Sequence, residues 1–199
     1  MTDKARQRQL AYAAREAQVD KDRVSAEICR RCIDQPWYQA AGTVLWYVHC
    51  RSEVRTLPAL SAALQEHRRI AVPYCTVDDQ GVKCLGLWHL RDIGELQAGL
   101  WNIPEPPRQR WSEPDRQIEV AELDAVLVPG VAFDRDGGRL GNGAGYFDRL
   151  LCRVRNDAVL AGVCYQSQVF PAIEMQSHDI YMDYVITEQQ VYCGGRRRR

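Results

Sequence analysis

Residues 43–48, TVLWYV, form an uninterrupted run of apolar, β-branched and aromatic side chains. A strand with one solvated face alternates polar and apolar residues, so an unbroken run predicts a strand buried on both faces. An amphipathic helical pattern at 57–68 and a second strand pattern at 69–75 follow it. Two neighbouring parallel strands need a crossover of about a dozen residues between them. These three segments therefore favour a parallel sheet that is covered by helices.

Further segments continue this alternation of strands and helices. Helical patterns occupy 3–18 and 21–34, ahead of the first strand. The other predicted strands are 84–90, 123–130, 158–165 and 182–187, and the other predicted helices are 92–99 and 145–155. Residues 101–114 contain four prolines and two tryptophans, which indicates an ordered, extended loop. The whole pattern predicts a three-layer α/β/α sandwich around a mostly parallel, Rossmann-like sheet.

The length of 199 residues suits one domain with a substantial core. We place that domain at residues 1–190 and expect a basic, disordered tail at 191–199, which ends in Arg196–Arg199. Lys plus Arg and Asp plus Glu number 26 each, so the chain without those four arginines carries an acidic excess. This balance argues against nucleic acid as a partner, and a solubilising end is the simpler interpretation of the tail.

Most of the eight cysteines lie inside apolar runs, so we expect buried thiols in a reducing compartment. Cys29 and Cys32 form a C-x-x-C within a helical pattern, without a second pair at zinc-finger spacing, which argues against a metal or redox site. The sequence has no apolar stretch of about 18 residues and no secretory leader pattern. We therefore expect a cytoplasmic protein that makes no membrane contact.

Alternate glycines occur in RLGNGAGYFDRLL, residues 139–151, directly before a helical pattern. Ordering such a backbone is costly, and its uncovered N–H groups, together with a helix N-terminus, can cradle a phosphate. Arg139 can contact that phosphate, and Asp148 in the first helical turn can hold Mg²⁺ against it. The spacing matches neither a P-loop nor a dinucleotide fingerprint. A tight structural turn therefore remains the alternative for the loop, and a helix-dipole role remains the alternative for Asp148.

Other candidate residues stand near the expected strand ends. Glu53 follows the first strand, where a carboxylate can hydrogen-bond a ligand, although a solvated loop acid is the alternative. Trp101 can stack on a planar heterocycle or cap the core. Asp179 and Asp183 precede the last strand, and either can supply a second Mg²⁺ ligand or simply form a turn.

Lys4 and Arg8 are four residues apart and share one helix face, so they can clamp phosphates together. A solvated, charged helix face is the alternative explanation. His178 has no Ser or Cys partner at a recognisable spacing, so the sequence supports no catalytic triad.

Taken in order, these motifs resemble the 5-formyltetrahydrofolate cyclo-ligase family, also called methenyltetrahydrofolate synthetase. The resemblance runs from residue 4 to about residue 188. It rests on the basic pair Lys4-x-x-x-Arg8, SEVRT at 52–56, WNIPEP at 101–106, VPGVAFDRDGGRLGNGAGYFDRLL at 128–151 and GVCYQSQVFPAIEMQSHDIYMDYVITE at 162–188. Five elements in register are far more specific than any one of them.

The resemblance implies a ligase of folate one-carbon metabolism that uses ATP as co-substrate and Mg²⁺. It implies the cyclisation of 5-formyltetrahydrofolate to 5,10-methenyltetrahydrofolate with release of ADP and phosphate. In that chemistry the formyl oxygen attacks the γ-phosphate, N10 closes the ring and phosphate leaves. Phosphoryl transfer of this kind requires positioning and charge neutralisation more than a strong base. The expected partners are a reduced folate and ATP, with the chain as a monomer or homodimer.

The resemblance also assigns site residues. ATP contacts fall on Lys4, Arg8, Arg139, Leu140, Gly141, Asn142, Gly143, Ala144, Gly145, Tyr146 and Phe147. Folate contacts fall on Val48, Glu53, Trp101, Asn142, Gly143, Ala144, Gly145 and Tyr146. Asp148 and Asp179 are the implied metal ligands, with Asp183 left open as the replacement for Asp179. Arg139 and Tyr146 are the expected catalytic residues.

The chain departs from the family pattern at several positions. Asn142 and Ala144 stand between the glycines, Phe147 replaces the second tyrosine, and His49 and Cys50 follow the first strand. Asn142 removes a positive contact that would favour nucleotide. A non-catalytic folate- or nucleotide-binding regulator on the same fold is therefore the alternative function.

Overall fold

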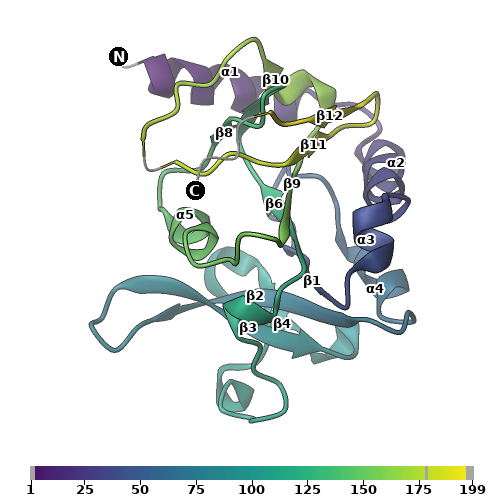
Figure 1. Cartoon of the computed structure of the whole chain (residues 1–199), viewed down its shortest axis with the longest axis vertical. Helices are drawn as coiled ribbons and strands as arrows, with labels where there is room; N and C mark the ends of the chain where they lie inside the picture. The colour runs from purple at the N-terminus through teal and green to yellow at the C-terminus, as the bar shows by residue number, and fades with distance from the viewer. Residues whose placement is uncertain (1–2, 178, 196–199) are drawn as a thin grey trace.

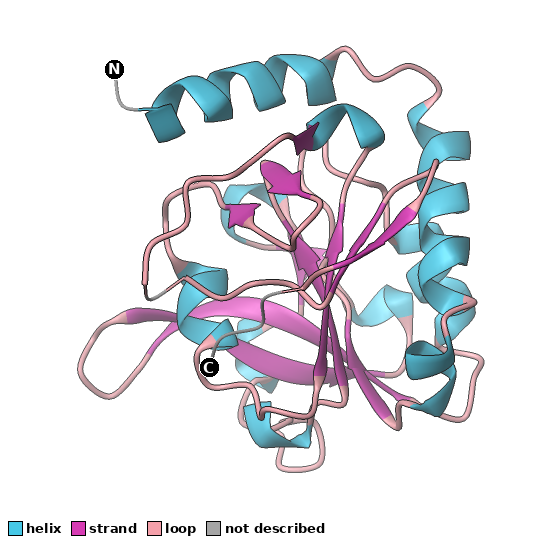
Figure 2. Cartoon of the chain, turned by 45° about the horizontal axis from the view of Figure 1, so that its top comes forward, coloured by secondary structure: helices cyan, strands magenta, loops and turns pink. Residues whose placement is uncertain are grey.

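A seven-stranded sheet organises the computed structural model, which describes residues 3–177 and 179–195 (Figures 1 and 2). Its strand order is β12 (Val191–Cys193), β11 (Tyr184–Ile186), β9 (Val159–Val163), β6 (Ala125–Pro129), β1 (Thr43–Leu45), β2 (Arg69–Val77) and β3 (Lys83–Leu90). The pairs from β11 to β2 are parallel, and the edge pairs β11–β12 and β2–β3 are antiparallel. The predicted mostly parallel sheet is confirmed.

Helices cover both faces of this sheet. Figure 1 shows α2 (Lys21–Ile33), α3 (Pro36–Ala40) and α4 (Leu57–Ala63) on one side and α5 (Tyr146–Leu151) on the other, while α1 (Asp3–Glu16) lies across one end. Successive residues of β1 face opposite layers, because Val44 packs with the α2–α4 side and Leu45 with the α5 side. The three-layer arrangement follows from strands that are apolar on both faces.

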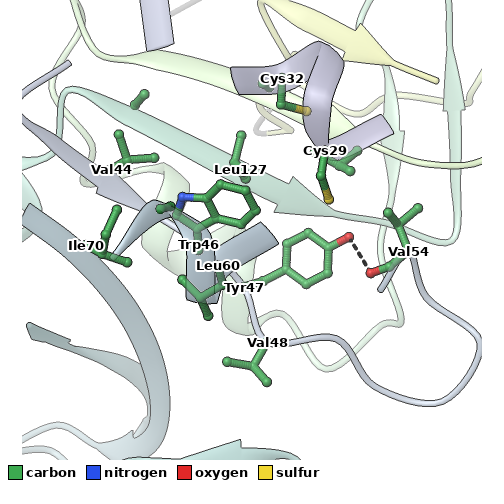
Figure 3. Packing of buried hydrophobic residues seen from close by; sticks show 14 of the residues in the cluster. Cys29, Cys32, Val44, Trp46, Tyr47, Val48, Val54, Leu60, Ile70 and Leu127 are labelled. Carbon is green, nitrogen blue, oxygen red and sulfur yellow. Dashed lines mark hydrogen bonds between the residues drawn. The ribbon is translucent and has the colours of Figure 1, made fainter. Parts of the chain in front are cut away.

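The apolar run at 43–48 is buried throughout, although its regular pairing ends at Leu45. Trp46 is completely buried among Val44, Ile70 and Leu127 (Figure 3). Its backbone N–H still donates to Ala71 O at 2.9 Å, and its indole Nε1 donates to Tyr38 Oη at 3.2 Å. The chain then turns out of the sheet with its side chains still inside the core, and this bend brings the next residues to the carboxyl edge.

Two predicted features are wrong. Residues 92–99 do not form a helix, because Glu95 folds back onto the N–H groups of Arg91 and Asp92 at 3.0 and 3.2 Å and closes a single turn. The next residues instead form β4 (Gln97–Ala98), which pairs with β5 (Pro104–Glu105). The tail also does not begin at residue 191, because β12 belongs to the main sheet. Arg196–Arg199 and His178 lie outside the described residues.

Several short strands and 3₁₀ turns were not predicted from the sequence. A small second sheet contains β10 (Val169–Phe170), β7 (Ala132–Asp134) and β8 (Arg139–Leu140). Short 3₁₀ turns lie at Ile93–Glu95, Leu100–Asn102, Arg108–Arg110, Val120–Glu122 and Gln166–Gln168. The small sheet directs the chain from the end of β6 back to the glycine stretch, so it positions the site.

The cysteines are less uniformly buried than expected. Cys29, Cys32 and Cys164 are buried free thiols, and burial raises the pKa of Cys29 to about 12. Cys152 and Cys193 are exposed, contrary to the expectation from their apolar neighbours. Among the residues that the structure describes, no helix combines the length and apolarity needed to cross a membrane.

Candidate active site

A pocket of about 380 Å³ opens at the carboxyl edge of the parallel strands. This is the edge at which doubly wound sheets collect ligands. Its walls come from the segment after β1, the end of β6, the glycine stretch, the β2–β3 hairpin, the β4–β5 loop and helix α1. Its lining includes Tyr12, Arg15, Tyr47, Val48, Cys50, Arg51, Glu53, Pro73, Cys75, Leu85, Trp101, Ile103, Glu105, Pro129, Gly130, Arg139, Gly141, Asn142, Gly143, Ala144, Gly145, Tyr146, Phe147 and Asp148.

The glycine stretch forms one wall of this pocket. Gly143 and Gly145 adopt φ values of +94° and +72°, which side-chain-bearing residues rarely adopt. A Cβ at Gly143 would meet no protein atom within 4 Å, so its open side faces free space. Tyr12 Oη donates to Asn142 Oδ1 at 2.5 Å, and Arg149 Nη2 donates to Ala144 O at 3.1 Å. These contacts hold the loop on either side of Gly143 and leave the space beside Gly143 open.

Arg139 provides a buried positive charge beside that loop, with its side chain only 6% exposed. Its Nη1 donates to Pro129 O at 3.0 Å, and its Nη2 donates to Asp148 Oδ1. Burial lowers the pKa of Arg139, while the Asp148 and Asp179 carboxylates act in the opposite direction. An ideal Cβ at Gly141 would lie 3.2 Å from Arg139 Nη1, so glycine there lets the guanidinium approach the loop closely.

Glu53 lies at the opposite wall, in the turn that follows β1. Its Oε2 accepts from Cys50 N–H at 2.9 Å, and its Oε1 lies 3.7 Å from Arg15 Nη1. Burial raises the pKa of Glu53, and the Cys50 N–H, Arg15 and Arg51 partly offset that rise. The prediction of a ligand-facing carboxylate after the first strand therefore has a suitable geometry.

Trp101 lies at the pocket mouth and is 55% exposed. Its φ of +57° and that of Asn102, +60°, are uncommon for residues other than glycine. Its ring meets Tyr146 edge to face, with centroids 6.0 Å apart. A large exposed ring held in a strained turn beside the pocket favours the stacking interpretation over core capping.

Some predicted site residues do not line the pocket. Lys4 Nζ lies 3.4 Å from Asp179 Oδ2, and Arg8 Nε donates to Gly141 O at 3.0 Å from behind the loop. Leu140 is buried in β8. Asp183 Oδ2 accepts from Leu160 N–H at 2.8 Å, near the amino end of β9 and away from the pocket edge. Of the two carboxylates near the last strand, Asp179 is thus the one near Arg139 and Lys4.

Some residues that line the pocket were not predicted from the sequence. Among these, Tyr12, Arg15 and Glu105 have polar side chains that make hydrogen bonds in the structure. Lys4, Arg8, Tyr12 and Arg15 share one face of α1, so extending the basic pair along the helix would have found them. Glu105 lies within WNIPEP, is buried and accepts from Cys75 N–H at 3.4 Å. Its pKa is raised by burial.

A doubly wound α/β protein with a glycine loop and a mixed apolar and charged pocket at the carboxyl edge belongs to the class of small-ligand-binding α/β proteins. The sequence pattern of the 5-formyltetrahydrofolate cyclo-ligase family matches residues 2–188, and the chain belongs to that family.

Named relatives agree with this family. The 5-formyltetrahydrofolate cyclo-ligase of Mycolicibacterium smegmatis is 31% identical over 148 residues, which cover 74% of each chain. A probable 5-formyltetrahydrofolate cyclo-ligase of Schizosaccharomyces pombe is 28% identical over 85% of this chain and 86% of its own. The solved structure of Aquifex aeolicus 5,10-methenyltetrahydrofolate synthetase superposes with a TM-score of 0.80 at 28% identity, covering 100% of this chain and 96% of that chain.

Proposed function

We propose that this chain catalyses the ATP-dependent cyclisation of 5-formyltetrahydrofolate to 5,10-methenyltetrahydrofolate, with release of ADP and phosphate. One observation carries the proposal: the same pocket is lined by a glycine loop that is open at Gly143 beside Arg139, by the Glu53 carboxylate, whose side chain is 11% exposed, and by the exposed indole of Trp101. The glycine loop and Arg139 suit a phosphate chain. Glu53 and Trp101 suit a flat heterocycle with N–H donors. Membership of the family supports the same substrates.

The reaction makes modest chemical demands that these residues can meet. The formyl oxygen on N5 bonds to the γ-phosphorus as ADP leaves, N10 then attacks the formyl carbon and loses its proton, and phosphate departs with the oxygen. Arg139 would neutralise charge on the transferred phosphoryl group, and Gly143 would admit the phosphates to the backbone. Tyr146 and Trp101 would hold the folate in line, which restricts the two reacting groups to a productive geometry.

The residues also fit a magnesium ion carried by the nucleotide. Asp148 is 55% exposed, lines the pocket and uses one carboxylate oxygen for Arg139. Magnesium commonly takes one or two carboxylates and completes its coordination with water and substrate phosphates. The described residues contain no cluster of three or more acidic, His or Cys side chains that could hold a metal. When bound, the ion supplies charge neutralisation at the phosphates.

Asp179 is the second proposed metal ligand. Its carboxylate holds Lys4 and accepts from Gln176 N–H at 2.8 Å. It would reach the ion once the phosphates draw Lys4 toward themselves, which would also give Lys4 and Arg8 their proposed contacts with ATP. The cytoplasmic location and the monomeric or homodimeric state remain predictions from the sequence.

The test is an enzyme assay in which the protein is mixed with 5-formyltetrahydrofolate and MgATP. The formation of methenyltetrahydrofolate is monitored by its absorbance. We expect product and ADP in equal amounts, and none when ATP or magnesium is omitted. Absence of both products from folded protein would refute the proposal. Folate binding without turnover would instead support the non-catalytic regulator.

A further inference from the structure

Arg15 is unusual among the residues that line the pocket, because its side chain is buried but not all of its N–H groups are hydrogen-bonded. Its side chain is 4% exposed, and its Nε donates to Ser52 Oγ at 3.1 Å. Within the described part of the chain, Nη1 has no hydrogen-bond partner. A buried charged donor without an acceptor is costly, so such a group in a pocket points to an acceptor supplied by a ligand.

The neighbour of that donor is Glu53. Arg15 Nη1 and Glu53 Oε1 are 3.7 Å apart, beyond hydrogen-bond distance but close enough for the two charges to attract. Glu53 Oε2 is held by Cys50 N–H at 2.9 Å, which fixes the carboxylate. Glu53, in the turn after β1, and Arg15, on α1, both line the pocket, so a fixed acceptor and a buried donor without a hydrogen bond lie side by side there.

We propose that Arg15 and Glu53 together read the edge of the substrate's 2-amino-4-oxopyrimidine ring, with Arg15 Nη1 donating to the 4-oxo oxygen while Glu53 accepts from the 2-amino group and N3–H. This assignment rests on the proposed function. The ring edge offers two donors followed by one acceptor, and the protein offers the complementary order. Arg15 is thereby a specificity-determining residue that selects a 4-oxo ring over a 4-amino ring.

The selection is a matter of unpaired groups. A 4-amino ring carries no proton on N3, so Glu53 loses that donor whatever residue stands at position 15. Its 4-amino group would in addition direct an N–H toward the Arg15 guanidinium, leaving both donors without acceptors, and sites of this kind discriminate strongly. A purely structural Arg15 would only neutralise Glu53 and would not distinguish the two rings. The relative affinity for the two rings is therefore the informative measurement.

The experiment compares binding of folic acid with binding of its 4-amino-4-deoxy analogue, alongside turnover of 5-formyltetrahydrofolate, in wild type and Arg15→Met. We expect the variant to bind folic acid on the order of tenfold more weakly, as loss of a charged hydrogen bond predicts, with little loss for the 4-amino analogue. The KM for 5-formyltetrahydrofolate should rise while the KM for ATP stays within twofold. Arg6→Met, an exposed arginine on the same helix, is the matched control.

Arg15→Lys keeps a positive charge next to Glu53. It controls for the possibility that Arg15→Met loses binding only because it unfolds. It should retain the wild-type melting temperature and recover part of the preference for the 4-oxo ring. If wild type turns over folate but neither Arg15 variant changes the preference, the role of Arg15 is refuted and the proposed function stands. If wild type neither binds nor turns over folate, both proposals fail together.

Discussion

Replacing Gly143 by alanine separates a ligand cradle from a structural turn. The native φ of +94° disfavours any residue with a Cβ, which costs about 1–3 kcal/mol. The new Cβ would meet no protein atom within 4 Å, so no steric clash adds to that strain. For a domain of this size each kcal/mol lowers the melting temperature by about 2–4 °C. We therefore expect a drop of several degrees and a folded protein.

Gly81 provides a matched control outside the pocket. Its φ is +77° and a Cβ there also meets nothing within 4 Å, so Gly81→Ala should lose similar stability through strain alone. Only Gly143→Ala places a methyl group where the nucleotide phosphates would approach, and its KM for ATP should rise at least tenfold, about 1.4 kcal/mol. The assay is steady-state ADP release with thermal unfolding of both variants. An unchanged KM for ATP in Gly143→Ala, or an equal rise in Gly81→Ala, would refute the cradle.

Three further substitutions test the remaining roles. Asp148→Asn should lower kcat more than tenfold with a modest change in melting temperature, since the carboxylate is 55% exposed, and magnesium titration of activity should show a weaker apparent affinity. Glu53→Gln should raise the KM for folate and leave that for ATP unchanged. Burial raises the pKa of Glu53 above its ordinary 4.5, so ionisation of this carboxyl opposes folding. Wild type should therefore lose stability relative to Glu53→Gln as the pH rises through the raised pKa of the folded state. Denaturant unfolding at a series of pH values measures this difference. Asp183→Ala removes the acceptor for the Leu160 N–H, so it should lose about 1–2 kcal/mol of stability yet keep its kcat, and a large loss of turnover would contradict the structural role of Asp183.

The central strands were predictable because a strand that is buried on both faces has a continuous run of apolar residues in the sequence. The same rule fails where order depends on partners distant in the sequence. The segment 92–99 looked helical, but Gln97 pairs with Glu105 and the turn is closed by the Glu95 side chain. The paired strands β7 and β8 are only three and two residues long, too short for any periodicity to appear. Tertiary pairing, and not local preference, decides these segments.

The site divides along similar lines. The glycine stretch, Glu53 and Trp101 could be predicted because each stands in a local pattern at a strand end. Arg15 shares a helix face with Lys4 and Arg8, so the helical spacing could have placed it beside them. The sequence does not show where that face docks, because α1 has almost no apolar face to define its orientation. Ala11 is its buried apolar residue, and polar contacts such as the one from Arg8 to Gly141 O attach it to the pocket.

The departures from the family pattern have partners within this structure, which weakens the case for a chain that has lost catalysis. Asn142 accepts from Tyr12 Oη at 2.5 Å, so it fastens the glycine loop to α1. His49 lies outside the pocket lining, where its Nδ1 accepts from Thr56 N–H at 3.1 Å inside the turn that presents Glu53. Phe147 lines the pocket and packs against the apolar residues on both the α2–α4 side and the α5 side of the sheet, where a hydroxyl is not needed. Asn142, His49 and Phe147 thus each take part in the packing of the pocket or of the turn beside it, so these three positions give no sign of a damaged site.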